Sequence, residues 1–423
     1  MKPETKSRLL ILTSSFPCGP DDETCGYVRH FARHLASDFC VTVLAPPADQ
    51  TVVMAVEPYR LIRSASLLPG RFNPFRSATD LNHLREASFL IKLAAAIALL
   101  SFFVRAAVLA LRADVICSHW LLPSGLMGAV LSKLLRKPHV AVEHSGALHL
   151  LAGLRGGALL TRFIVAGSRR VAVVSQDLRR KLITLCPAAA DKCEVMPMGV
   201  AMTGRADVAQ AISLCMMDHA RNTAQANSLR HILFIGRLTR IKGVDVLIEA
   251  LRENRNARLI IAGDGPERNP LERMAAELAI NVEFLGRINA ARRDALLASC
   301  DVVVIPSRLI DNRSEGTPVV CLEALAAGRA VIASSTGGLA EIICDPHNGL
   351  LFEPGNASML AEKLQTILQD AALRRRLGEN ARRTAAEYAW PRIAAVYARL
   401  IKESLNRNAI HTNTSADAER AAC

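Results

Sequence analysis

The sequence is poor in aromatic residues and lacks the cysteine pairs and glycine motifs that mark several protein classes. Phe, Trp and Tyr make up 4% of its 423 residues, which argues against a single-strand nucleic-acid platform, because such platforms stack bases on aromatic rings. The eleven cysteines are scattered and form no Cys-x-x-Cys pair, so we expect reduced, mostly buried thiols and no structural zinc. No Gly-x-Gly-x-x-Gly occurs, so a dinucleotide oxidoreductase is poorly supported.

A signal peptide is also absent from the sequence pattern. Met1 to Ser7 is polar, and the short apolar run Leu9 to Leu12 predicts a first strand. We therefore expect a cytoplasmic protein, with association at the inner face of the plasma membrane left open. The formal net charge of +13 is uneven: residues 1–200 hold 24 Lys and Arg against 14 Asp and Glu, giving +10 and leaving +3 for the rest. A basic surface suits phosphorylated substrates, anionic lipid or nucleic acid.

One apolar stretch, Ala87 to Leu111, is about long enough to span a bilayer. Lys92 and Arg105 interrupt it, and charged residues near the centre of a span are costly. We predict a buried or interfacial helix of the first domain instead, with peripheral contact to an anionic membrane as a partner hypothesis.

Short runs rich in Val and Ile alternate with longer helix-like segments, a pattern typical of βα units around parallel sheets. The fold class is therefore α/β, with two Rossmann-like domains whose parallel sheets face each other across a cleft. We expect an N-terminal acceptor-side domain over 1–200, completed by a C-terminal helix at about 389–405. A linker or insertion over 201–229, a donor-binding domain over 230–388 and a polar tail over 406–423 complete the prediction.

The stretch NRSEGTPVVCLEALAAGRAVIAS is the most informative. Glu315 and Glu323 stand eight residues apart, and a helix is predicted from about Thr317 to Ala327. Pro318 near its start and Gly328 past its end fit helix-boundary chemistry. The exposed amides of its first turn can receive an anion. One carboxylate could hold sugar hydroxyls and the other a ribose diol, although an isolated pair of glutamates is more often two solvated helix carboxylates.

The E-x7-E pattern, followed by Gly337, Gly338 and Glu341, resembles the donor-site signature of a large family of retaining nucleotide-sugar glycosyltransferases with the GT-B fold. The resemblance covers most of the chain and is closer in the C-terminal half. It implies transfer of a hexose-type sugar from a UDP- or GDP-sugar to a glycan or lipid-linked acceptor in cell-surface polysaccharide or glycolipid synthesis. It also implies donor-binding roles for two upstream positions and for residues of the segment that joins the two glutamates: Gly265, Arg287, Glu315, Gly316, Thr317, Pro318, Val319 and Glu323.

Two cations follow the strand-like run HILFIG. Arg237 stands at the strand end and Lys242 at the mouth of the next helix. The resemblance implies that they hold the donor diphosphate, and fixed positive charge would stabilise a departing diphosphate in any case. No Asp-x-Asp occurs, so we expect neither a metal nor another cofactor. For Asp264 and Glu267, in the following loop, a plain turn role and donor contact remain equally open.

Three further positions point to the N-terminal half. Gly26, in PDDETCGYVRHF, would let a phosphate or sugar approach the backbone. The family often has two adjacent glycines there, whereas this chain has Cys25 and Gly26. His144 follows the run VAVE and matches the family's active-site histidine beside the reacting sugar. His119 ends the run DVICSH and is a possible acceptor-side residue; packing roles remain open for both histidines.

The resemblance implies catalysis by His144, Arg237, Lys242 and Glu315 with retention of anomeric configuration. Alternatives remain open: a nucleotide-sugar epimerase or hydrolase on the same fold, or a non-catalytic nucleotide-sugar or nucleic-acid binding protein that uses the basic half. We do not expect nucleic acid as a partner.

Overall fold

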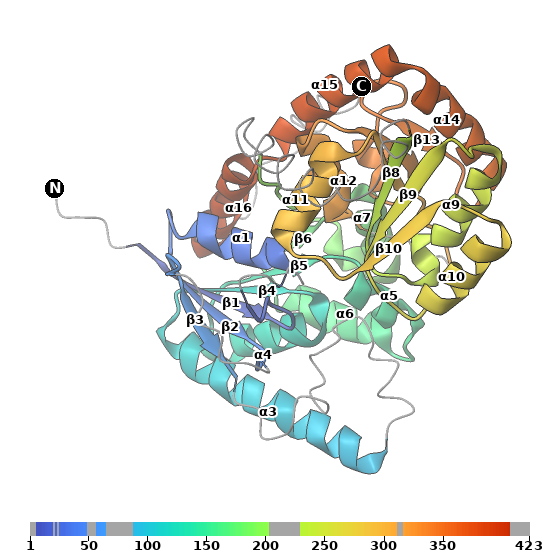
Figure 1. Cartoon of the computed structure of the whole chain (residues 1–423). Coiled ribbons are helices and arrows are strands. Elements are labelled where there is room, and N and C mark those ends of the chain that lie inside the picture. The colour runs from blue at the N-terminus through green and yellow to red at the C-terminus, as the bar shows by residue number, and fades with distance from the viewer. Residues whose placement is uncertain are drawn as a thin grey trace. The chain divides into compact units, whose positions relative to one another are not determined.

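The computed structural model describes residues 6–19, 22, 25–48, 56–64, 88–202, 229–310 and 316–406. The chain divides into two compact units (Figure 1). Unit 1 is Met1–Pro197 together with Trp390–Cys423, and unit 2 is Met198–Ala389.

Unit 1 is built on a parallel seven-stranded sheet in the order β3-β2-β1-β4-β5-β6-β7. The strands run through apolar segments whose side chains are almost all buried, as expected for a sheet covered on both faces. Their bounds are β1 (Arg8–Thr13), β2 (Cys40–Ala45), β3 (Arg60–Arg63), β4 (Val115–His119), β5 (His139–Glu143), β6 (Arg170–Val173) and β7 (Cys193–Val195).

Helices cover both faces of this sheet, with α1 and α16 on one face and α3 on the other (Figure 1). Ser175 caps α7 by accepting from the Leu178 amide at 3.2 Å. The described helices are α1 (Gly26–Leu35), α3 (Phe89–Arg112), η2 (Leu121–Gly125), α4 (Leu126–Leu135), α5 (Gly146–Gly153), α6 (Gly157–Ala166), α7 (Gln176–Leu185), η3 (Pro187–Ala189) and α16 (Trp390–Leu405).

The C-terminal helix α16 packs on α1 within unit 1. The Trp390 ring stacks on His30 and His34 with centroid distances of 5.9 and 5.7 Å. Buried Tyr397 meets Phe31 edge to face and donates its hydroxyl to the Met196 carbonyl at 2.7 Å. These contacts tie the end of the chain to its first helix.

Unit 2 is built on a parallel six-stranded sheet in the order β10-β9-β8-β11-β12-β13. Asparagine or aspartate caps three of its helices, because Asn289, Asn356 and Asp370 each accept from the amide three residues on. The strands are β8 (Arg230–Ile235), β9 (Ala257–Ala262), β10 (Val282–Gly286), β11 (Val302–Ile305), β12 (Ala330–Ser334) and β13 (Leu350–Phe352). The helices are η5 (Arg240–Lys242), α9 (Val244–Ala250), η6 (Leu251–Glu253), α10 (Arg268–Glu277), α11 (Ala290–Ser299), α12 (Val319–Ala326), α13 (Leu339–Ile342), α14 (Ala357–Gln369) and α15 (Ala371–Glu387).

The α/β class and the two parallel sheets confirm the predicted fold, and each strand-like run named by pattern is a strand. The sequence pattern missed two strands. β3 carries arginine at both ends, and β13 has three residues; both lie at sheet edges. Most of the predicted linker, 203–228, and the tail residues 407–423 lie outside the described residues.

The predicted apolar helix is α3. It is long and apolar enough to cross a membrane by length and composition, with a mean hydropathy of 2.3, and 28% of its most apolar window is buried. Part of α3 is buried in unit 1 and one face is exposed, so the helix is not buried all round, and contact with a membrane stays a prediction.

Eight described cysteines are free thiols, and five of them are buried, as the apolar runs around them predicted. Exposed Cys18 and Cys40 are exceptions to the expected burial. Cys344 is disulfide-bonded, which corrects the expectation of reduced thiols at this residue; nothing among the described residues explains it.

Candidate functional site

Each sheet has a point at which the strand order reverses. In unit 1 it lies between β1 and β4, and in unit 2 between β8 and β11. Connections leave a parallel sheet in opposite directions at such a point, so a crevice opens beyond the carboxyl ends of the strands, where ligands bind. The predicted site residues follow these strands in both units.

In unit 1, the structure brings the two predicted histidines together. His119 Nδ1 lies 2.9 Å from His144 Nε2, and the two rings stack with a centroid distance of 5.2 Å and an interplanar angle of 5°. The sequence separates them by 25 residues, but β4 and β5 pair in register, so their carboxyl ends are neighbours.

Burial keeps both imidazoles neutral. Desolvation lowers the pKa of His119 to about 3. It also lowers the pKa of His144 well below its usual value, and His119 adds to that shift. A neutral ring carries one N–H, so one histidine donates to the other. His119 Nε2 is buried without a hydrogen-bond partner. The tautomer that leaves no buried N–H unsatisfied has His119 Nδ1–H donating to His144, which then carries its own proton on Nδ1.

Aromatic rings enclose the histidine pair. Tyr27 of α1 and Trp120 after β4 each place a ring centroid 4.9 Å from that of His144. Phe31 meets His119 edge to face at 4.8 Å. These contacts fix the orientation of the ring of His144, a residue that is half-buried as a whole.

Glu143, the last residue of β5, is a buried carboxylate that the sequence analysis missed. It accepts from the Leu121 and Ser145 amides at 2.8 Å each and from the Leu148 amide at 3.2 Å. Desolvation raises the pKa of Glu143, and the backbone donors oppose that rise. The carboxylate joins the loop after β4 to the loop after β5, and these loops carry the histidine pair. A lone acid at the end of the apolar run VAVE was the available signal.

Three residues around this edge have left-handed backbone: Cys25 (φ 54°), Trp120 (φ 67°) and Ser145 (φ 124°). Residues other than glycine hold such conformations at a cost, and they cluster at functional sites. Cys25 thus takes a conformation that glycine favours, at the position where the family often has a second glycine. Gly26 opens α1 directly after it.

In unit 2, glycines allow the loops after β8, β9 and β10 to pack backbone on backbone. A Cβ at Gly263 would lie 1.8 Å from the Gly236 carbonyl oxygen, and one at Gly265 would lie 2.2 Å from that of Leu238. The Gly263 amide donates to the Gly286 carbonyl at 2.7 Å. Gly265 therefore has a close-packing role, whether or not it also contacts a donor.

The loop with the two predicted cations is held against the loop after β11. A Cβ at Gly243 would lie 1.9 Å from the Pro306 carbonyl oxygen, and the Arg308 amide donates to the Ile241 carbonyl at 2.7 Å. Arg308 also forms an ion pair with Asp245 of α9. Arg237 is exposed and Lys242 half-buried, so this turn presents cationic side chains at the switch point of unit 2.

The segment that leads into α12 reaches the same edge of the sheet. The Gly338 amide donates to the Gly316 carbonyl at 2.9 Å, and a Cβ at Gly338 would lie 2.1 Å from that oxygen. Pro318 is the N-cap of α12, so the helix begins at Val319, two residues later than predicted, directly after Gly316 and Thr317. Glu315 lies outside the described residues, and its position at the site stays a prediction.

Glu323, the second predicted carboxylate, has an arginine partner. Its Oε1 lies 2.9 Å from Nη1 of Arg293 on α11, and Arg293 Nε also contacts Asp294 at 3.0 Å. Arg293 was not foreseen, because nothing in the sequence pairs α11 with α12. Contact between Glu323 and a ribose remains a prediction.

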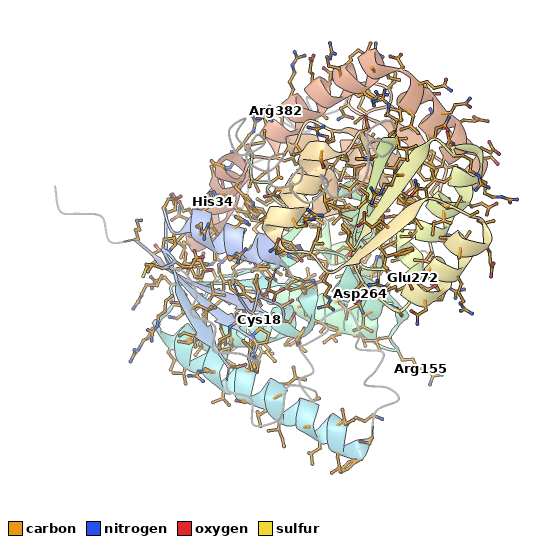
Figure 2. The ribbon with its side chains drawn as sticks, in the orientation of Figure 1. Cys18, His34, Arg155, Asp264, Glu272 and Arg382 are labelled. Carbon is orange, nitrogen blue, oxygen red and sulfur yellow. The ribbon has the colours of Figure 1, made fainter. Side chains whose placement is uncertain are left out.

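The outer loop residues are open to solvent. Asp264 and Arg287 are exposed, and Glu267 is half-buried as the N-cap of α10. Figure 2 labels Asp264, which lies in the loop after β9. The Asp264 carboxylate accepts from the Gly265 amide at 2.8 Å, which supports the turn role for this residue.

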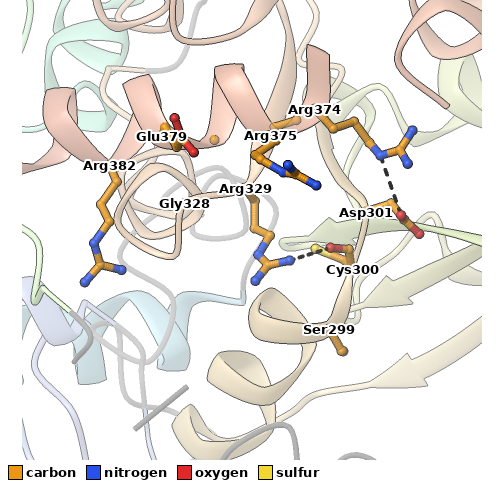
Figure 3. Close-up of a pocket in the computed structure, with 11 residues that line it drawn as sticks. Ser299, Cys300, Asp301, Gly328, Arg329, Arg374, Arg375, Glu379 and Arg382 are labelled. Carbon is orange, nitrogen blue, oxygen red and sulfur yellow. Dashed lines mark hydrogen bonds and ion pairs between the residues drawn. The ribbon is translucent and has the colours of Figure 1, made fainter. Parts of the chain in front are cut away.

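A cavity of about 420 Å³ lies elsewhere in unit 2 (Figure 3). It adjoins Asp301 and Arg329, which directly precede β11 and β12, so it opens at the amino ends of the strands rather than at the predicted site. Arg329 donates to the Cys300 carbonyl at 3.1 Å, and Arg374 contacts Asp301 at 3.7 Å. These arginines satisfy groups at that edge of the sheet and are distinct from the predicted donor residues.

Two α/β units, each a parallel sheet with a switch point, and glycine-rich loops after the strands of the second are the architecture of the GT-B class of glycosyltransferases. Comparison with known proteins agrees. Residues 26–203 match the family described as Glycosyltransferase Family 4, and residues 218–384 match Glycosyl transferases group 1. The chain therefore belongs to the glycosyltransferase family to which these two matched regions correspond.

Its relatives include an uncharacterized glycosyltransferase of Methanocaldococcus jannaschii, 33% identical over 293 residues that cover 66% of this chain and 73% of that protein. A D-inositol 3-phosphate glycosyltransferase of Pseudarthrobacter chlorophenolicus is 30% identical over 318 residues, covering 71% and 73%. Among solved structures, Anabaena HepE in complex with UDP shares the fold with a TM-score of 0.68 at 19% identity, covering 94% of this chain and 100% of that chain.

Proposed function

We propose that the protein is a retaining, metal-independent hexosyltransferase that uses a UDP- or GDP-sugar. Unit 2 would hold the donor, and a glycan or lipid-linked acceptor would bind unit 1, in the synthesis of a cell-surface polysaccharide or glycolipid on the cytoplasmic side. The observation that carries the proposal is the packing of the turn bearing Arg237 and Lys242 against the loop after β11 at the switch point of unit 2.

The diphosphate is the part of the donor that this edge suits best. Arg237 and Lys242 supply positive charge, and the first amides of α12, which also follows a strand at the carboxyl edge of this sheet, supply backbone donors. Both features strengthen their interaction as the bond from sugar to phosphate breaks and charge builds on the leaving group. HepE was solved with UDP and also with UDP-glucose, which supports a uridine diphosphate donor.

The histidine pair suits hydrogen bonding to a sugar more than proton donation from a charged ring. With its pKa well below neutral, His144 stays uncharged, and its Nδ1–H can donate to a hydroxyl or an acceptor oxygen. His119 would then act as a positioning residue that sets the tautomer of His144. In this proposal Glu315 contacts the transferred sugar, and the leaving phosphate itself receives the acceptor proton.

The experiment is a ligand screen followed by product analysis. The purified protein is heated with UDP, GDP and their sugars, because a ligand that binds the native state must stabilise it, by about 2.7 kcal/mol at a hundredfold excess over Kd. The stabilising donor is then incubated with glycan and lipid-linked acceptors, and NMR reads the anomeric configuration of the product.

We expect transfer with retained configuration, and loss of transfer in Glu315→Gln with the melting temperature unchanged. Inverted product would refute the retaining mechanism. Conversion or hydrolysis of the donor without any acceptor would instead show an epimerase or hydrolase. Salt-sensitive binding of nucleic acid without affinity for any nucleotide sugar would show a binding protein.

A further inference from the structure

The long helix α3 exposes a continuous apolar face that the transfer chemistry does not use. Eight large apolar side chains on this helix are between 40% and 76% exposed. Figure 2 shows side chains projecting from α3 on the side away from the sheet. The eight residues, which we call the α3 apolar face, are Phe89, Leu90, Leu93, Ile97, Leu100, Val104, Val108 and Leu111.

The α3 apolar face is a single stripe. At about 100° per residue, its eight members fall within an arc of about 100° around the helix axis. Lys92 lies about 60° outside the stripe on one side, and Arg112 and Arg105 lie about 40° and 60° outside it on the other. All three are exposed, and α3 contains no acidic residue.

The opposite side of α3 is fixed in the core of unit 1. Phe102, Ala106 and Ala110 are fully buried and pack in one cluster with Leu12 of β1 and Leu131 of α4. The C-terminal half of the helix, whose full length is about 36 Å, is therefore fixed to unit 1 and cannot leave it without exposing this core.

The segments next to α3 are also basic and also expose apolar side chains. From Phe89 to Arg170 the chain has ten Lys and Arg but two acidic residues. Of these two, Asp114 pairs with Arg8 and Glu143 is buried. Leu134 of α4 and Leu159 of α6 are exposed by 70% and 72%, and α4 contacts both α3 and α6.

We propose that α3 is an interfacial helix that docks unit 1 on an anionic lipid bilayer, with the α3 apolar face inserted at the boundary between headgroups and acyl chains. An apolar stripe between cations, on a helix without acids, is what such a surface binds. A second copy of the chain would bring cations against cations. A spanning helix would place Arg105 in the hydrocarbon and strip the core of unit 1. The inference is independent of the donor and of the transfer step.

The test compares two substitutions with matched exposure. Ile97 lies in the α3 apolar face and is 40% exposed, whereas Val396 is 38% exposed on α16, which covers the other face of the sheet. Full-length Ile97→Glu and Val396→Glu are co-sedimented with phosphatidylglycerol and phosphatidylcholine vesicles, beside the wild type. A third variant, Arg105→Glu with Arg112→Glu, tests the cations.

We expect wild type to bind phosphatidylglycerol vesicles more tightly than phosphatidylcholine vesicles, and to be released by alkaline carbonate. Ile97→Glu should bind at least about tenfold more weakly, because an inserted side chain is lost and a like charge is added. Val396→Glu should stay within about twofold, and the double arginine variant should lose the preference for anionic lipid.

Each variant is also tested for stabilisation by the donor nucleotide and for its mass by light scattering. Wild-type tryptophan fluorescence in Ile97→Glu shows that unit 1, which holds both tryptophans, keeps its fold. Retained nucleotide binding separates this proposal from the proposed function. Wild-type vesicle binding in Ile97→Glu overturns the proposal. Resistance of the wild type to carbonate, or a wild-type dimer that Ile97→Glu dissociates, also overturns it, in favour of a span or of a second copy.

Discussion

Replacing Glu143 tests the claim that one buried carboxylate holds the two loops of the histidine site. Its oxygens accept three backbone N–H groups: Oε2 from Leu121, and Oε1 from Ser145 and Leu148. A glutamine can keep its carbonyl oxygen at the Oε1 position, which loses the bond to Leu121. A leucine loses all three bonds.

A buried donor without a partner costs about 1–3 kcal/mol. We therefore expect Glu143→Gln to lower the free energy of unfolding of unit 1 by about 1–3 kcal/mol and Glu143→Leu by at least about 3 kcal/mol. That is a large share of the roughly 5–15 kcal/mol that stabilises a typical domain. Desolvation raises the pKa of Glu143, so the buried charge itself costs stability. Both substitutions remove that cost, and we therefore expect losses at the low end of these ranges.

The assay is urea denaturation followed by tryptophan fluorescence. The chain has two tryptophans, Trp120 and Trp390, and both belong to unit 1, so the signal reports on that unit. Glu194→Gln is the control, because Glu194 lies on β7 of the same sheet but is exposed; its effect should stay within about 0.5 kcal/mol. If the urea midpoint of Glu143→Leu equals that of the wild type, the claim that Glu143 holds the two loops together is refuted.

Three further predictions follow from the same geometry. Gly243→Ala should destabilise unit 2 by at least about 2 kcal/mol in calorimetry, because φ is 63° and the new Cβ would meet the Pro306 carbonyl; an unchanged melting temperature would contradict the close packing. Unit 1 should lose stability as pH falls below about 6.5. The unfolded chain then protonates His119 and His139, whose folded pKa is about 3. A free energy of unfolding that stays constant between pH 7 and 4, measured by tryptophan fluorescence, would contradict this. Glu323→Gln should weaken UDP binding about tenfold in calorimetric titration if its carboxylate holds the ribose. Asp294→Asn also removes a carboxylate from Arg293 but should leave UDP binding unchanged. Equal losses of affinity in the two variants would show that the ion pair with Arg293, not a ribose contact, is what matters.

The fold was largely predictable because buried parallel strands consist of short runs of Val, Ile and Leu. Runs such as VAVE and HILFIG became β5 and β8. The two missed strands lie at sheet edges, where one side of the strand has no neighbour to bury it. β3 has arginines at both ends, and β13 has only three residues, which are too few to show the hydrophobic pattern of a strand.

The sequence named candidate site residues one by one, and their roles stay predictions, but it did not give their geometry. The sequence suggested His119 and His144 separately, and the 2.9 Å contact between them depends on the register of β4 and β5. Arg293 could not be foreseen, because its contact with Glu323 joins two helices with no shared motif. Glu143 was visible as an acid in an apolar run, yet its role depends on loop backbone that no pattern encodes.

The central claim is that the turn after β8 forms an anion site for the donor diphosphate. The most direct measurement is calorimetric titration of UDP into Lys242→Ala and Arg240→Ala, since both residues lie in η5 and Arg240 is exposed. We predict at least a tenfold loss of affinity for Lys242→Ala, since one charged contact to phosphate contributes about 1.5–3 kcal/mol, and a change within about twofold for Arg240→Ala. Equal affinity in Lys242→Ala and wild type would contradict the account.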